Sequence, residues 1–92
     1  MAQADARHIL VESKERCQEL IDEINAGADF AELARENSLC PSKNKDGELG
    51  TFSPGKMVKE FDEVAFNADV GVIYGPVKTE FGYHLLQVTW RG

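Results

Sequence analysis

Long apolar segments are missing from this sequence, since none approaches the ~20 residues that a membrane-spanning helix needs. The first five residues, Met-Ala-Gln-Ala-Asp, also lack the basic and apolar regions of a signal peptide. Both absences lead us to expect a cytoplasmic protein, unless the chain is a module of a longer exported protein. Internal repeats and low-complexity segments are absent as well, which excludes a repeat architecture.

Positive charge is scarce, with 10 Lys and Arg residues against 16 Asp and Glu residues and a net charge of −6. Nucleic-acid affinity depends largely on clustered Lys and Arg side chains. The only local basic cluster, Lys43 and Lys45, is offset by Asp46 and Glu48. We therefore expect no nucleic-acid partner, and we interpret the cluster as part of a solvated loop.

Cysteine and histidine occur only twice each, as Cys17, Cys40, His8 and His84. They lack the short paired spacings that preorganise structural zinc, so we expect neither a metal nor another cofactor. Cys17 lies on the apolar face of a predicted helix, where a buried free thiol is commoner than a disulfide. A Cys–His protease is disfavoured too. Such a site needs a base, an orienting group and an oxyanion hole, and 92 residues leave little room for a cleft.

The length of the chain, 92 residues, fits one small domain with a single modest core. We assign residues 6–92 to this domain and residues 1–5 to an N-terminal tail. Hydrophobic residues make up 42% of the chain and charged residues 28%, which is typical of a soluble globular protein. We expect it to be monomeric.

Two strands at opposite ends of the chain each contain a histidine. Residues 6–11 predict the first strand, and a second begins at Gly82. Because side chains alternate between the faces of a strand, His84 shares a face with Leu86 and Val88. Domain termini often lie close together, so the two strands could be neighbours in one sheet. In that case His8 and His84 would meet on one face, where we expect the functional site.

Two helices are predicted after the first strand. Ser13 offers an N-cap, and apolar residues then recur at helical spacing until Gly27, which ends the first helix. Asp29 begins the second helix, with Glu32 three residues later as in a capping box. The residues expected to face the core are Cys17, Leu20, Ile21 and Ile24 in the first helix and Phe30, Leu33 and Ala34 in the second.

The second half of the chain alternates strands with one more helix. A polar connection over residues 37–50 leads into a short predicted strand over residues 49–52. Apolar residues at helical spacing predict a third helix over residues 56–68. Residues 71–78 predict an edge strand, because Pro76 cannot donate to a ladder. The order β-α-α-(loop)-β-α-β-β is typical of an α+β fold with an antiparallel sheet.

Composition and periodicity alone predict no activity. A single histidine is more often a hydrogen-bonded structural residue than a catalyst, and Cys40 is more often a packed small side chain. Met57 and Phe61, four residues apart on the predicted third helix, are more often core residues than a substrate pocket. These patterns therefore go no further than a soluble α+β domain with a polar cluster on its sheet.

Six motifs follow one another along nearly the whole chain. They are His8-Ile-Leu-Val, Gly27-Ala-Asp-Phe-Ala-Glu-Leu-Ala, Ser38-Leu-Cys-Pro-Ser, Gly47-Glu-Leu-Gly-Thr-Phe, Met57-Val-Lys-Glu-Phe and Gly75-Pro-Val-Lys-Thr-Glu-Phe-Gly-Tyr-His. Each motif is weak by itself, but the set resembles the parvulin family of peptidyl-prolyl cis–trans isomerases. The resemblance implies a four-stranded antiparallel sheet flanked by three to four helices, with an active site on the concave face of the sheet. The length resembles that of a stand-alone parvulin catalytic domain.

The resemblance also implies roles for particular residues. His8 and His84 match the paired histidines of the family, Thr79 matches the threonine of the same hydrogen-bond network, and Ser38 lies near it. Cys40 occupies a position where members carry cysteine or aspartate. The remaining matched positions are Leu49, Met57 and Phe61, which correspond to the pocket for the substrate proline, and Phe81, where members carry a hydroxyl or an aromatic residue.

The activity implied by the resemblance is non-covalent rotation about Xaa-Pro bonds in unfolded or exposed segments of client proteins, which assists folding. The alternative is a non-catalytic module that binds proline-containing peptides. We expect the two histidines to share a hydrogen bond and to organise the site without transferring protons. Phosphate-directed parvulins carry a basic loop after the first strand. Residues 12–16, Glu-Ser-Lys-Glu-Arg, contain only two cations, so we expect no phosphate requirement.

Overall fold

The computed structural model describes residues 3–57 and 59–92, with the side chains of residues 42 and 43 left out. Three α-helices, one short 3₁₀ helix and four strands make up the described part of the chain. In chain order they are β1 (Ala4–Val11), α1 (Lys14–Asn25), α2 (Phe30–Asn37), the 3₁₀ helix η1 (Pro41–Lys45), β2 (Glu48–Phe52), α3 (Lys59–Asn67), β3 (Ile73–Thr79) and β4 (Gly82–Arg91).

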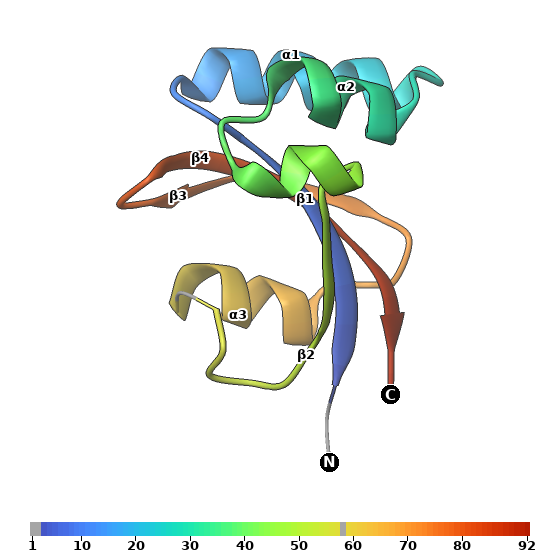
Figure 1. The fold of residues 1–92 in the computed structure, drawn as a ribbon, viewed down its shortest axis with the longest axis vertical. Coiled ribbons are helices and arrows are strands. Elements are labelled where there is room, and N and C mark those ends of the chain that lie inside the picture. The colour runs from blue at the N-terminus through green and yellow to red at the C-terminus, as the bar shows by residue number, and fades with distance from the viewer. Residues whose placement is uncertain (1–2, 58) are drawn as a thin grey trace.

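The four strands form one antiparallel sheet in the order β2-β1-β4-β3 (Figure 1). The first and last strands are therefore the central pair, as the sequence predicted. Their pairing extends to Gln3 and Gly92, whose backbones exchange two hydrogen bonds of 2.9 and 3.0 Å. The expected α+β fold is confirmed, with β2 and β3 as the edge strands.

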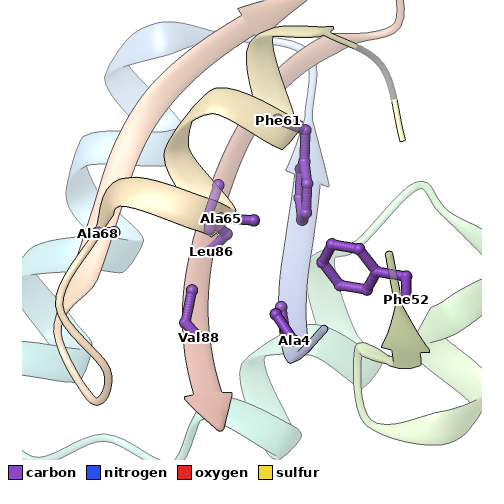
Figure 2. Packing of buried hydrophobic residues seen from close by; sticks show 8 residues of the cluster. Ala4, Phe52, Phe61, Ala65, Ala68, Leu86 and Val88 are labelled. Atoms are coloured by element: carbon purple, nitrogen blue, oxygen red, sulfur yellow. The ribbon is translucent and has the colours of Figure 1, made fainter. Parts of the chain in front are cut away.

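Helices cover both faces of the sheet. Helices α1 and α2 lie on one face and α3 lies on the other (Figure 1). Alternation along β1 and β4 therefore divides the core into two clusters. The cluster under α1 and α2 contains Ile9, Val11, Cys17, Leu20, Ile21, Phe30, Ala34 and Leu85. The cluster under α3 contains Ala4, Ala6, Phe52, Phe61, Ala65, Ala68, Leu86 and Val88 (Figure 2).

The starts of α1 and α2 predicted from the sequence are confirmed. The Ser13 hydroxyl accepts a hydrogen bond from the Arg16 backbone N–H at 2.9 Å, and the Asp29 carboxylate accepts one from the Glu32 N–H at 3.2 Å. Gly27 follows the C-cap of α1 with φ +111°, a conformation that favours glycine. Local capping therefore fixes both ends of α1 and the start of α2.

Several element boundaries differ from the predictions, three of them near the site or the termini. β1 begins at Ala4, inside the expected N-terminal tail, because Ala4 is buried and pairs with Phe52 and Arg91. β3 runs from Ile73 to Thr79, which places Thr79 in the strand. The third helix begins at Lys59, so Met57 precedes it; residue 58 of the predicted helix lies outside the described residues. Within the described parts, no helix combines the length and the apolar character needed to cross a membrane.

Candidate active site

The two histidines meet at the centre of the sheet. His84 pairs with Leu10 and His8 pairs with Leu86, so the histidines are diagonal neighbours on the face covered by α3. Their Nδ1 atoms lie 3.0 Å apart, and the rings are stacked at 16° with centroids 5.2 Å apart. Both side chains are buried, each 5% exposed. The face predicted for the functional site is thus the face on which the histidines form a hydrogen-bonded pair.

Thr79 extends this pair at the end of β3. Its hydroxyl lies 2.7 Å from Nε2 of His84 and accepts a hydrogen bond from the backbone N–H of Phe81 at 3.2 Å. Two sets of tautomers satisfy all three bonds: either Thr79 donates to Nε2 of His84 and Nδ1–H of His84 donates to Nδ1 of His8, or both of these bonds run in the opposite direction. A chain of hydrogen bonds therefore runs from the β3–β4 turn to β1 and fixes both ring orientations.

Burial determines the charge of the histidine pair. Burial, together with the smaller effect of the neighbouring His84, lowers the pKa of His8 to about 4. Burial also lowers the pKa of His84. Both rings are consequently neutral near pH 7, since desolvation disfavours the charged form of an imidazole. The pair can orient and polarise, but it is poorly suited to donating a proton at neutral pH.

An apolar cavity of about 400 Å³ lies beside the histidine pair. Phe61 contacts both imidazoles edge-on, with ring centroids 5.7 Å from His8 and 6.0 Å from His84. The cavity is lined by His8, Leu10, Leu39, Cys40, Pro41, Leu49, Met57, Phe61, Phe81 and His84. Strand β2, the segment before α3, α3 itself and the β3–β4 turn all contribute to this lining. Such a cavity can hold an apolar ring and remove the adjoining amide from water.

Cys40 is positioned by the segment between α2 and η1. Its backbone N–H donates to the hydroxyl of buried Ser38 at 3.3 Å, and the same hydroxyl accepts the Leu10 N–H at 3.1 Å. The Leu39 N–H donates to the Leu10 carbonyl at 2.8 Å. Ser38 therefore ties this segment to β1, next to His8. The Ser38 hydroxyl accepts two backbone hydrogen bonds, which explains why Ser38 lies near the hydrogen-bond network of the histidines.

Gly47 allows β1 and the β2 segment to approach closely at the site. Its carbonyl accepts the His8 N–H at 3.0 Å, and its φ is +84°. A Cβ at this position would lie 2.6 Å from the His8 carbonyl oxygen and 3.2 Å from the Ala34 Cβ. Only glycine fits this approach without displacing His8.

The structure brings the predicted site residues together. Seven of them line the cavity: His8, Cys40, Leu49, Met57, Phe61, Phe81 and His84. Thr79 lies behind His84, outside the lining. The sequence interpretation missed Leu10, Leu39 and Pro41. Leu10 could have been found, since it is two residues from His8 on the same strand; loop residues Leu39 and Pro41 had only their proximity to Cys40 as a signal.

Among the described residues, no group of three or more His, Cys, Asp and Glu side chains is arranged to hold a metal ion. Cys17 belongs to the core cluster under α1 and α2, whereas Cys40 lines the cavity on the other face. Both thiols are free. The two cysteines therefore lie in separate parts of the fold, and only Cys40 belongs to the site.

Known proteins resemble the chain in sequence and in structure. A foldase protein PrsA from Halalkalibacterium halodurans is 46% identical over 92 residues, covering 99% of this chain but 28% of that protein. The crystal structure of a peptidylprolyl isomerase (PrsA) from Bacillus anthracis aligns with a TM-score of 0.96 and 36% identity, covering 99% of this chain and 42% of the other. The chain therefore spans less than half the length of these relatives.

One solved structure matches the chain over most of its own length. The solution structure of NmPin, the parvulin of Nitrosopumilus maritimus, aligns with a TM-score of 0.87 and 36% identity, covering 96% of both chains. Residues 3–90 match the family described as the rotamase, or PPIC-type PPIase, domain. With the histidine pair and the apolar cavity in place, the chain belongs to the PPIC-type family of peptidyl-prolyl cis–trans isomerases, the parvulins.

Proposed function

We propose that this domain catalyses rotation about Xaa-Pro bonds in unfolded or exposed segments of client proteins, without a phosphate requirement, and so assists their folding. The observation that carries the proposal is the apolar cavity bounded by Leu49, Met57 and Phe61 directly against a neutral histidine pair. The cavity is the place for the proline ring of the substrate. The histidine pair and Cys40 form the polar side, next to the bond that rotates.

Isomerisation breaks no covalent bond, but the amide must pass a barrier of ~18–20 kcal/mol because resonance between nitrogen and carbonyl is lost on twisting. Water stabilises the planar, charge-separated amide. An apolar cavity removes that stabilisation, and fixed dipoles beside the carbonyl favour the twisted state selectively. The lining residues Leu49, Met57 and Phe61 supply the apolar part.

The hydrogen-bond chain Thr79–His84–His8 acts as a rigid support in this mechanism. Its members hold one another by bonds of 2.7 and 3.0 Å and are buried, so their dipoles need not reorient during the reaction. Cys40 lines the cavity and tunes the electrostatics beside the substrate carbonyl. No covalent attack by Cys40 is part of the mechanism.

The surroundings of the cavity favour substrates without phosphate. The connection between β1 and α1 consists of Glu12 and Ser13 alone. Arg16, the arginine of α1, forms ion pairs with Glu19 at 3.2 Å and Glu23 at 3.5 Å. No Lys or Arg belongs to the cavity lining found among the described residues. A dianionic phosphate would therefore meet little uncompensated positive charge here.

The test is a protease-coupled isomerisation assay on short Xaa-Pro peptides, with Xaa as Glu, Leu, Arg or phosphoserine. We expect faster cis-to-trans conversion than the uncatalysed ~10–100 s, without any advantage for phosphoserine. A large preference for phosphoserine would contradict phosphate independence. If the domain does not accelerate isomerisation but the peptide shifts the NMR signals of cavity residues, the alternative of a non-catalytic proline-binding module is supported.

The name foldase borne by the PrsA relatives supports a role in folding. Because the chain spans 28% of the first of them, the activity and clients of a complete protein of that kind are proposals here. The cytoplasmic location, the monomeric state, the absence of a nucleic-acid partner and the assignment of residues 6–92 to one domain stay predictions from the sequence.

A further inference from the structure

A second hollow, also of about 400 Å³, lies next to the proline cavity. Leu39 lines both hollows and is 56% exposed, so it forms the ridge between them. The remaining lining is mostly polar and comes from the end of β1, the start of α1 and the end of α2: Val11, Glu12, Ser13, Arg16 and Asn37. The two hollows are thus adjacent, and an extended peptide that crosses Leu39 reaches both.

Most polar groups of the second hollow are already held by neighbours. The Ser13 hydroxyl accepts the Arg16 N–H, and the guanidinium of Arg16 donates to the side-chain oxygen of Asn37 at 3.1 Å. The same guanidinium is paired with Glu19 and Glu23. The positive charge of Arg16 is therefore compensated, with two carboxylates against one cation.

Glu12 is the exception in this lining. Its side chain is exposed, and no ion pair or side-chain hydrogen bond of Glu12 occurs among the described residues. With Arg16 compensated by Glu19 and Glu23, the uncompensated charge of this lining is that of Glu12. A cationic side chain placed there would find an available carboxylate, whereas an anionic one would be repelled.

We infer that the second hollow is a subsite for a basic residue of the client, within about three residues of the proline that occupies the first cavity. The occupant is the same extended peptide, because Leu39 lines both hollows and the two are therefore adjacent. The subsite would direct the domain toward Lys- or Arg-containing segments. This inference rests on the proposed function, since it places the proline in the first cavity.

The test compares otherwise identical peptides that carry one Lys or one Glu at each of the three positions before and after the proline. Near 0.15 M salt, where the Debye length is about 8 Å, we expect kcat/KM to be about threefold higher for Lys than for Glu at one position. Glu12→Gln should reduce that ratio toward one, and Glu12→Lys should invert it. Glu15→Gln is the matched control. It removes the same charge from an exposed residue that lines neither hollow, so the ratio should stay.

An all-alanine proline peptide separates the two proposals. If that peptide is isomerised but Lys and Glu peptides do not differ at any position, the subsite is wrong and the isomerase stands. If no peptide is isomerised, the affinities of Lys and Glu peptides are compared by NMR titration. A Lys preference lost in Glu12→Gln then supports the subsite without catalysis, and equal affinities overturn it.

Discussion

The Nδ1 atoms of His8 and His84 lie 3.0 Å apart, although 76 residues separate them in the chain. The contact exists because the first and last strands are the central neighbours of the sheet, with Leu10 opposite His84. The charged form of either ring is unfavourable there, since both rings are buried. A neutral, hydrogen-bonded pair beneath an apolar cavity is thus a direct consequence of the strand order.

Removing the hydroxyl of Thr79 should weaken both stability and activity. Thr79→Ala leaves Nε2 of His84 and the N–H of Phe81 without their partner. We expect the free energy of unfolding to fall by about 1 kcal/mol and kcat/KM to fall about tenfold, because the rings lose their fixed orientation. Urea unfolding and the isomerisation assay measure the two effects. Thr79→Ser keeps the hydroxyl and should retain most of the activity; equal losses in both variants would contradict a role for the bond.

The cavity assignment predicts different effects for two apolar residues near α3. Met57 lines the cavity, whereas Val64 only packs against the core cluster under α3. Met57→Ala should raise KM by about fivefold to tenfold, the usual cost of lost contact with a small apolar group. Val64→Ala is the matched control, which should lower stability but leave KM unchanged. Steady-state kinetics with one proline peptide checks both variants, and a similar KM for them would argue against the pocket.

Local patterns in the sequence predicted most of the architecture, because alternation and capping are short-range properties. Ser13 and Asp29 begin their helices as expected. The pairing of His8 with His84 was predicted from the expected proximity of the two terminal strands and from the family resemblance. Two details did not follow. The position of Met57 before α3 and the exposure of Leu39 depend on loop conformations, which tertiary contacts set and no periodicity encodes.

The two thiols should differ in accessibility. Cys17 is buried in the core, and burial raises its pKa to about 11, so little thiolate forms at pH 8. Cys40 is partly exposed at the cavity. An aromatic disulfide reagent at pH 8 should therefore modify one thiol quickly and the second only after unfolding. Cys40→Ser should abolish the fast phase, and Cys17→Ser should leave it; two fast phases in the native protein would contradict the burial of Cys17.

A non-covalent role for Cys40 makes a separate prediction. Aspartate cannot replace a nucleophilic thiol that forms a covalent adduct with an amide carbon, but it can supply a dipole or charge beside the carbonyl. We expect Cys40→Asp to keep at least about a tenth of kcat/KM, the loss reflecting changed geometry. The assay with a single proline peptide decides this. Complete loss of catalysis in a folded Cys40→Asp variant, with a fold verified by NMR, would favour covalent chemistry.

The buried histidine pair should make stability depend on pH in a defined window. The unfolded chain protonates His8 near pH 6.5, but the folded chain does so only near pH 4. Between these values the unfolded state binds more protons, so the free energy of unfolding decreases as the pH falls from about 6.5 to about 4. The loss attributable to His8 is on the order of 3 kcal/mol. His8→Asn keeps a side chain that can hydrogen-bond to His84 but cannot titrate. Urea unfolding of both proteins at several pH values should show a steeper decrease for the histidine form, and parallel curves would mean that His8 ionises normally in the folded protein.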